Sequence, residues 1–176
     1  YLILKKSYLL ELQNLNLTIS NSLILNNISF ALKKNEILGI VGESGSGKSI
    51  TAFSILSLIN SAEIKRSGKI FFKNIRIDKL STKELEKIRG KEISIIFQEP
   101  MSSLNPTMKC GKQIEEIVLK HCFLKGPEIK NRVNELLRMV QLSNDADLYN
   151  KYPYQLSGGQ QQRLMIAIAI ACDPKI

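Results

Sequence analysis

Histidine and cysteine are scarce in this sequence, and their scarcity excludes several kinds of site. His121 is the only histidine, so a metal site built from several histidines is excluded. The three cysteines, Cys110, Cys122 and Cys172, are an odd number and form no C-x-x-C pair. This arrangement argues against a disulfide framework and against a zinc site, and it favours a reducing compartment.

Long hydrophobic runs are also missing. The longest apolar run, Leu164 to Cys172, is about half of the ~20 residues that a membrane-spanning helix needs. The run therefore predicts a buried helix of a globular domain. The first residues show no signal-peptide pattern, and we expect the chain to be soluble.

Acidic residues are outnumbered by basic ones, and the formal net charge is +9. The two signs are interleaved between residues 63 and 92, which is typical of a solvated face. Attraction to an anionic membrane surface and weak contact with nucleic acid stay open as alternatives. Because 44% of the 176 residues are hydrophobic, the chain can bury the core of one α/β domain with room for an inserted subdomain.

Four apolar stretches predict strands. Residues 10–19 alternate apolar and polar side chains like a half-buried strand, and residues 23–32 form a second strand-like stretch. Residues 36–41 form a short apolar strand that runs directly into a glycine-rich loop. The β-branched run at 93–97 is typical of a buried parallel strand.

Helical periodicity begins after the glycine-rich loop and dominates beyond residue 98. Residues 50–59 predict a mostly buried helix, and two amphipathic helices follow at 114–121 and 129–140. Residues 81–84 fit a capping box, and residues 160–172 predict a last helix that is nearly all apolar. The order of these elements predicts an α/β fold with a parallel core and a helical insertion.

The glycine-rich loop reads G-E-S-G-S-G-K-S and matches the phosphate-binding pattern G-x-x-x-x-G-K-[ST]. Glycine permits the dihedral angles and the close approach by which backbone N–H groups surround polyphosphate oxygens. Lys48 supplies a cation for the β- and γ-phosphates, and the Ser49 hydroxyl is placed to ligate Mg²⁺. An ordinary glycine-rich turn is the alternative, which the apolar strand before the loop and the helix after it disfavour. We expect an ATP site formed by Gly42, Glu43, Ser44, Gly45, Ser46, Gly47, Lys48, Ser49 and Ile50.

A second anion-binding motif opens the last predicted helix. Residues 156–160 read L-S-G-G-Q, and a serine followed by two glycines at a helix start can bind an anion. Standing alone, the motif would be read more simply, with Ser157 as an N-cap and the glycines as the end of a loop. One nucleotide does not obviously need two such sites.

The two motifs together resemble the ATP-binding cassette (ABC) family, and the resemblance covers essentially the whole chain. Residues 95–98, I-I-F-Q, match the family's strand and Q-loop. Residues 98–106, Q-E-P-M-S-S-L-N-P, are similar to the Q-loop segment of importer ATPases for oligopeptides, dipeptides and nickel. The resemblance implies an ATP-hydrolysing subunit that energises uptake of peptides, nickel or a related small solute.

The family's fold is a P-loop NTPase. It combines a RecA-like parallel sheet core with an N-terminal antiparallel β region and an inserted helical subdomain. By this resemblance residues 1–97 and 158–176 form the core with its β region. Residues 98–157 form the helical subdomain, which ends in the signature motif L-S-G-G-Q.

Partners and further site residues follow from the same resemblance. Two cassettes of the family pack head to tail, so that each nucleotide lies between one subunit's phosphate-binding loop and the other's signature motif. Lys48 and Gln98 would be catalytic, and Ser49 and Gln98 would hold Mg²⁺. The signature residues in contact with the partner's nucleotide would be Ser157, Gly158, Gly159 and Gln160.

Beyond the second ATPase subunit, the expected partners are integral membrane permease subunits, reached through the helical subdomain, and indirectly a solute-binding protein. Nucleic acid is not expected as a partner. The expected location is peripheral, at the cytoplasmic face of the plasma membrane.

Two departures from the family pattern qualify these expectations. The sequence stops at Ile176, before the family's Walker B strand, and we expect the chain alone to be inactive. An aromatic residue that would stack on adenine is missing near Ile19, and Tyr8 and Phe30 lie in unsuitable places. The alternatives are a soluble cassette ATPase in DNA repair or translation and a non-catalytic nucleotide-binding fragment.

Overall fold

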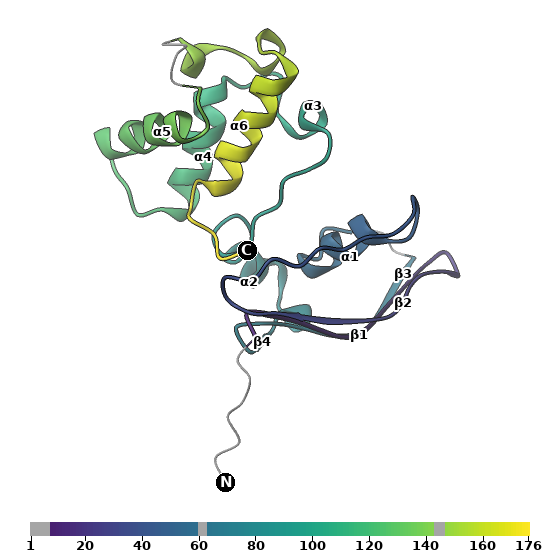
Figure 1. The fold of residues 1–176 in the computed structure, drawn as a ribbon. Helices are drawn as coiled ribbons and strands as arrows, with labels where there is room; N and C mark the ends of the chain where they lie inside the picture. Colours follow the sequence, from purple (N-terminus) through teal and green to yellow (C-terminus); the bar gives the residue numbers. More distant parts are fainter. Residues whose placement is uncertain (1–7, 60–62, 143–146) are drawn as a thin grey trace. The chain divides into compact units, whose positions relative to one another are not determined.

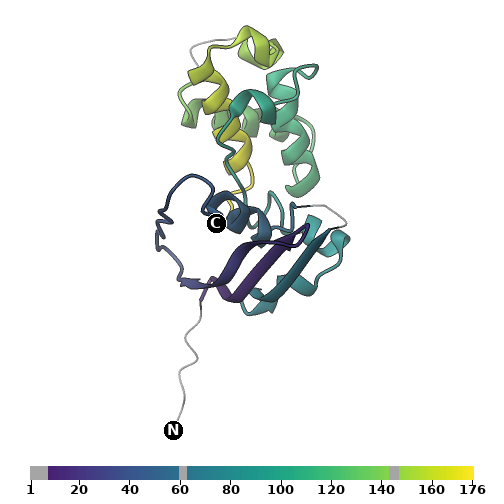
Figure 2. The ribbon, with the colours of Figure 1, turned by 90° about the vertical axis from the view of Figure 1, so that its right-hand side faces the viewer.

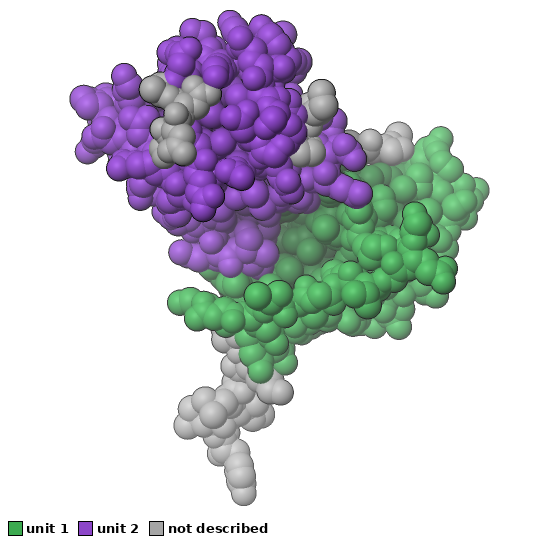
Figure 3. Space-filling view, turned by 45° about the horizontal axis from the view of Figure 1, so that its top comes forward, with its two compact units in different colours: residues 1–85 green, residues 86–176 purple. Residues whose placement is uncertain are grey.

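The structure, a computed structural model, describes residues 8–59, 63–142 and 147–176. The chain divides into two compact units, residues 1–85 and 86–176, and each is described by itself (Figure 3). The first unit carries the strands, and the second carries most of the helices.

An antiparallel sheet dominates the first unit (Figure 1). Its strands are β1 (Leu10–Ile19), β2 (Ser22–Leu32), β3 (Ile64–Phe72) and β4 (Ile75–Arg76), in the order β2-β1-β3-β4. The strands predicted at 10–19 and 23–32 are therefore confirmed to within one residue.

The sequence of β1 explains how this strand sits in the sheet. Its leucines are buried on one face, as the alternation predicts. The three-residue step from Leu12 to Leu15 breaks the alternation, and the pairing with β2 shifts register there. Asn14, inside the step, has a φ of 49°, so a bulge returns the next leucines to the buried face.

Two helices of this region begin at the motifs that predict them. The helix α1 (Lys48–Ile55) follows the glycine-rich loop and ends four residues before the predicted end at residue 59. The helix α2 (Thr82–Glu86) begins at the predicted capping box. The backbone N–H and the hydroxyl of Ser81 both donate to Glu84 Oε2, at 2.8 and 2.6 Å.

The second unit is a helical cluster, seen from two sides in Figures 1 and 2. Its helices are α3 (Pro100–Ser103), α4 (Cys110–His121), α5 (Pro127–Met139) and α6 (Gly158–Ile170), with 3₁₀ turns η2 (Leu148–Asn150) and η3 (Pro153–Gln155). The apolar faces of α4, α5 and α6 share one buried core. All three helices were predicted, although α4 begins four residues and α6 two residues before the predicted starts.

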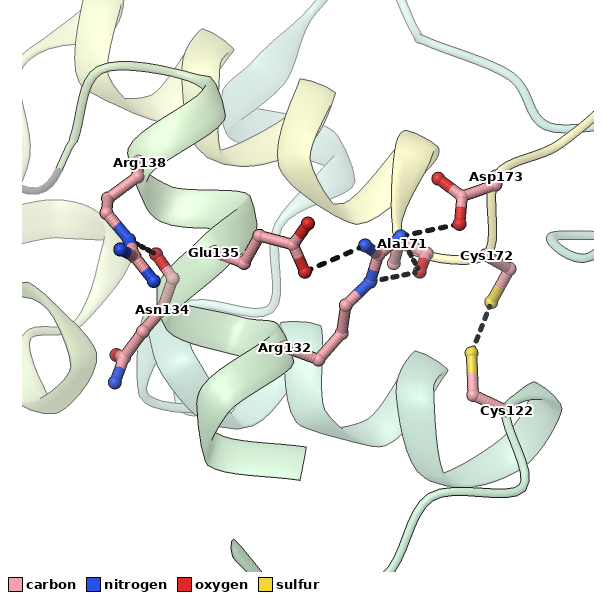
Figure 4. A network of polar contacts seen from close by, with 8 residues as sticks. All are labelled: Cys122, Arg132, Asn134, Glu135, Arg138, Ala171, Cys172 and Asp173. Atoms are coloured by element: carbon pink, nitrogen blue, oxygen red, sulfur yellow. Dashed lines mark hydrogen bonds and ion pairs between the residues drawn. The ribbon is translucent and has the colours of Figure 1, made fainter. Parts of the chain in front are cut away.

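The C-terminal end of α6 is tied to α5 by Arg132 (Figure 4). Its guanidinium donates to the Ala171 carbonyl and forms ion pairs with Glu135 (3.0 Å) and Asp173 (2.8 Å). A cation at a helix C-terminus also interacts favourably with the helix dipole. Beside it, the free thiols of Cys122 and Cys172 lie 3.6 Å apart, which joins the end of α4 to the same point.

The two strands predicted for the parallel core are not formed in the described residues. Residues 36–41 run as irregular chain, and the side chains of Ile37 and Val41 are 98% and 93% exposed. A strand needs a neighbour for its backbone groups, and in the described part of the chain no strand pairs with this segment. The apolar sequence is therefore present without the ladder that would make it a strand.

Parallel contacts do occur around Ile93. One isolated bridge joins it to Arg89. In addition, the Ile176 N–H donates to the Glu92 carbonyl at 3.2 Å, and the Ser94 N–H donates to the Ile176 carbonyl at 2.8 Å. This is the hydrogen-bond pattern of a parallel pair between Ile93 and Ile176.

The compact units do not coincide with the domain division predicted from sequence. That division assigned residues 158–176 to the core, whereas α6 packs here against α4 and α5. The assignment of residues 1–97 and 158–176 to the core, and of 98–157 to a helical subdomain, stays a prediction.

Candidate functional site

The loop at residues 42–49 is shaped by glycine at its last turn before α1. Gly47 is the residue that precedes the helix, and its φ of 88° lies in the left-handed region. A Cβ there would lie 2.7 Å from Leu25 Cδ2 and 3.3 Å from the Ile24 carbonyl oxygen. Gly47 therefore meets both a conformational and a steric requirement, and it fixes the loop against β2.

The Lys48 side chain folds back onto its own loop. Its ammonium donates to the carbonyl oxygens of Gly42 (2.9 Å) and Glu43 (2.7 Å), with Ser46 Oγ at 3.4 Å. The cation is thus held at the segment that the sequence assigns to the phosphates. Carbonyl oxygens hold an ammonium less strongly than anionic phosphate oxygens do, so a polyphosphate can replace them as partners.

The start of α1 supplies the remaining features of an anion site. The Thr51 N–H donates to the Gly47 carbonyl at 2.8 Å, so regular helical bonding begins there. The amides before Thr51 have no partner within the helix, and the positive end of the helix dipole lies among them. Ser49 is exposed in this first turn. The cation, the amides without a helical partner and the glycine at position 47 fit a polyphosphate.

Gln98 lies in the second unit, exposed at a bend that follows residues 93–97. Ser49 belongs to the first unit, so the two predicted Mg²⁺ ligands are parts of separately described units. Joint coordination of a metal by Ser49 and Gln98 stays a prediction. Among the described residues, no cluster of three or more histidine, cysteine, aspartate or glutamate side chains could hold a metal ion.

The signature segment forms the N-terminus of α6, as predicted. Ser157 is the N-cap, and its hydroxyl accepts from the Gln160 N–H at 3.3 Å. The Gln160 side chain in return accepts from the Ser157 N–H at 2.9 Å, which completes a capping box. Gly158 and Gly159 are exposed, and a Cβ on either would meet no atom within 4 Å. Ser157 is thus an N-cap, whereas Gly158 and Gly159 belong to the first turn of α6 and do not end the preceding loop, and the turn is open to an approaching group.

Two cavities of the second unit lie away from both predicted loops. They have volumes of about 640 and 610 Å³ and lie along α4 and α5 and at the end of α6. Their linings include no residue of 42–49 or of 157–160. Residues 42–46, Ser49 and 157–159 are exposed, so most of both segments can be reached by a ligand that a second molecule closes in.

Sequence reasoning missed two buried glutamines that hold loops near the predicted sites. Gln113 of α4 accepts from the Asn105 N–H and donates to the Asn105 and Met108 carbonyls. Gln161 of α6 donates to the carbonyls of residues just before the signature serine. For Gln161 the signal in the sequence was a polar residue three positions before the apolar Leu164 in the helix predicted at 160–172. Gln113 lies one residue before the helix predicted at 114–121, so the sequence carried no signal for it.

Phosphate-binding loops occur in several protein families, and comparison with known proteins identifies the family of this chain. A model of the ABC transporter family matches residues 25–176, which is most of the chain. The chain belongs to the ABC transporter family. The position of the match agrees with the phosphate-binding loop and the signature motif of an ABC protein.

Its relatives among curated proteins are named for peptide transport. The oligopeptide transport ATP-binding protein AppD of Bacillus subtilis is 47% identical over 154 residues, covering 85% of this chain and 46% of the relative. The dipeptide transport ATP-binding protein DppD of Lactococcus lactis is 48% identical over 155 residues, covering 86% of this chain and 44% of the relative. This ABC chain therefore spans about half the length of the curated relatives that it matches.

Solved structures show the same fold. The ATP-binding cassette MJ0796, in a dimeric post-hydrolysis state with ADP and Pi, is similar with a TM-score of 0.79 at 32% identity. The similarity covers 94% of this ABC chain and 70% of that one. CbiO1 of Clostridium perfringens is similar with a TM-score of 0.74 at 27% identity, covering 96% and 63%. The P-loop NTPase fold class is confirmed. Among the described residues of this ABC chain, no helix is both long and apolar enough to span a membrane.

Proposed function

We propose that this chain is the nucleotide-binding part of an ATPase subunit that powers import of peptides across the plasma membrane. The carrying observation is that one chain presents two exposed helix starts suited to phosphate, at Lys48 and at Ser157. The names of the relatives favour peptides over nickel as the solute. They also favour a transporter subunit over a soluble cassette in DNA repair or translation.

ATP is bound, in this proposal, by residues 42–50. The backbone amides at the start of α1 donate to phosphate oxygens, and Lys48 exchanges its loop carbonyls for the β- and γ-phosphates. Mg²⁺, when bound, neutralises charge that develops on the β- and γ-phosphates. Ser49 would hold it through the exposed hydroxyl at the start of α1, and Gln98 through its side-chain amide.

A second subunit completes the site. The open turn of Gly158 and Gly159 approaches the nucleotide held by the partner, and the partner's turn approaches this chain's nucleotide. Two-fold head-to-tail packing uses both helix starts of each chain, which explains why one chain carries two. The subunit pair works at the cytoplasmic face with permease subunits, which contact its helical part, and indirectly with a solute-binding protein.

Substitution of Lys48 tests the nucleotide site. We expect Lys48→Ala to weaken ATP binding by about 2–3 kcal/mol, or roughly 30- to 150-fold, because a charge-assisted contact to phosphate is lost. Titration calorimetry measures the affinity, and Lys34→Ala, at an exposed lysine before the loop, is the matched control. Equal affinities of Lys48→Ala and the unsubstituted protein would refute the assignment of this loop.

A further inference from the structure

Gln161 is a buried polar side chain directly behind the signature turn. It is 4% exposed, although it belongs to the first turns of α6, where Gly158 and Gly159 are exposed. Its Nε2 donates to the Pro153 carbonyl at 2.8 Å and to the Leu156 carbonyl at 3.3 Å. One side chain of α6 therefore holds the chain that leads into α6.

The segment that Gln161 holds is itself a tight turn. The turn η3 carries its own capping box, in which the Tyr152 N–H donates to Gln155 Oε1 at 2.8 Å. The side chains of Pro153 and Leu156 are buried. The contact to the Leu156 carbonyl lies immediately before Ser157, so it sets the direction in which the chain enters the helix.

The capping box of Ser157 and Gln160 does not fix that direction. It satisfies the amides of Ser157 and Gln160 and sets where the helix begins. The angle between a helix and the preceding chain depends on contacts across the helix start. Here the contact across the start is made by the Gln161 side chain.

The other end of the Gln161 amide is unsatisfied. The amide group of Gln161 faces the carbonyl oxygens of Pro153 and Leu156, and a carbonyl oxygen can only accept. The Nε2 atom must therefore point toward them, and Oε1 points away. Oε1 is then buried, with no hydrogen-bond partner among the described residues. Burial of an unpaired acceptor is destabilising. An apolar side chain of equal length would avoid that cost but would lose both donated hydrogen bonds, so the Nε2 donor is the part of Gln161 that holds the preceding chain.

We propose that Gln161 is a positioning residue for the signature turn. Its donation to the Pro153 and Leu156 carbonyls holds Ser157, Gly158 and Gly159 in the orientation that meets the triphosphate bound on the partner subunit. The inference rests on the proposed function, since it assigns the turn a nucleotide on a second copy of the chain. Gln161 itself touches no nucleotide.

The test compares Gln161→Met and Gln162→Met in the full-length protein. Methionine keeps the length of the side chain but cannot donate. Gln162 is the exposed neighbour and serves as the matched control. Each variant is measured for ATP affinity as a monomer, for ATP-driven dimerisation by analytical ultracentrifugation and for the melting temperature.

Gln161→Met is expected to need at least about tenfold more protein for ATP-driven dimerisation, a shift of ~1.4 kcal/mol. Its monomer affinity is expected to stay within about twofold of the unsubstituted protein, because the loop at 42–49 is untouched. Gln162→Met is expected to dimerise normally.

Normal dimerisation of Gln161→Met would overturn the inference and leave the proposed function intact. A parallel loss of monomer affinity and melting temperature would also overturn it, because it would show a merely structural role. If the unsubstituted protein fails to bind ATP or to dimerise with it, the proposed function itself fails, and the inference fails with it.

Discussion

A phosphate-binding loop uses glycine either for its positive φ or for its lack of a side chain, and Gly45 and Gly47 differ in which of these applies. Both have positive φ, of 88° and 81°. A Cβ at Gly47 would collide with Leu25, whereas a Cβ at Gly45 would meet nothing within 4 Å. Both positions therefore need a residue that tolerates positive φ, but only Gly47 also needs the absence of a side chain.

Alanine at each position should show this difference. We expect Gly45→Ala to cost about 1–2 kcal/mol through its left-handed backbone alone. We expect Gly47→Ala to cost about 1–3 kcal/mol more, because the new methyl group displaces Leu25 or the loop. Urea unfolding measures both costs, and equal values would show that the contact with β2 is unimportant.

Asp78 makes the stability of the first unit depend on pH in the acidic range. Burial would raise the pKa of this carboxyl, but hydrogen bonds from Arg76 and from the Ile70 N–H lower it below its usual value. A lowered pKa means that the charged form stabilises the fold above the ordinary value of about 3.9. This stabilisation is lost as the pH falls through the lowered pKa in the folded state.

We therefore expect the unsubstituted protein to lose stability between about pH 5 and pH 2 more steeply than Asp78→Asn. Asp78→Asn should be less stable at pH 7, because the ion pair with Arg76 and the charged acceptor for Ile70 are gone. Urea titrations across this pH range measure the effect, with Glu86→Gln as an exposed control. Parallel pH curves for Asp78→Asn and the unsubstituted protein would contradict the account.

At the scale of elements, the sequence predicts helix starts and the alternation of a strand correctly, but it does not predict which strands pair. The capping box at Ser81, the N-cap at Ser157 and the alternation of β1 are determined within a few residues, and each begins or forms its element. The strands predicted at 36–41 and 93–97 depend on neighbours far along the chain. Apolar sequence reports burial, but it does not report which strand will supply the partner.

The contact between α4 and η2 is a further feature that the sequence conceals. Gly111 of α4 is buried, and a Cβ there would overlap the ring of Tyr149. The ring is held because its hydroxyl donates to Glu115 at 2.8 Å. Glycine inside a helix normally costs up to about 1 kcal/mol relative to alanine. Here the lost propensity is compensated by the close packing of the ring.

We expect Gly111→Ala to destabilise the protein by about 1–3 kcal/mol, in spite of alanine's higher helix propensity. Gly158→Ala is the control for stability, since that helical glycine has open space around it and should cost nothing. Thermal and urea unfolding give both values. Adding Tyr149→Ala should remove most of the penalty of Gly111→Ala, and full additivity of the two substitutions would contradict the proposed overlap.

At the scale of the whole molecule, two helix starts were predicted to bind anions, and their use on a shared nucleotide follows only from the resemblance. The loop at 42–49 and the turn at 157–160 each have the predicted form. Contact of either with nucleotide depends on a ligand and a second chain, so the residues predicted to bind ATP stay predictions. The sequence did not predict the role of Gln161, because that role depends on hydrogen bonds to the Pro153 and Leu156 carbonyls that form only in the folded chain.

The central claim is that the turn at Ser157 acts on a nucleotide bound by another subunit. Ser157→Arg in the full-length protein tests it most directly, with ATP affinity and ATP-driven dimerisation measured on one preparation. Asn134→Arg adds the same charge at an exposed position of α5 and is the control. The account predicts near-normal ATP binding by the Ser157→Arg monomer and no dimer with ATP, because a bulky cation blocks the approach of Gly158 and Gly159. A Ser157→Arg protein that still dimerises with ATP, or that loses monomer binding, would contradict it.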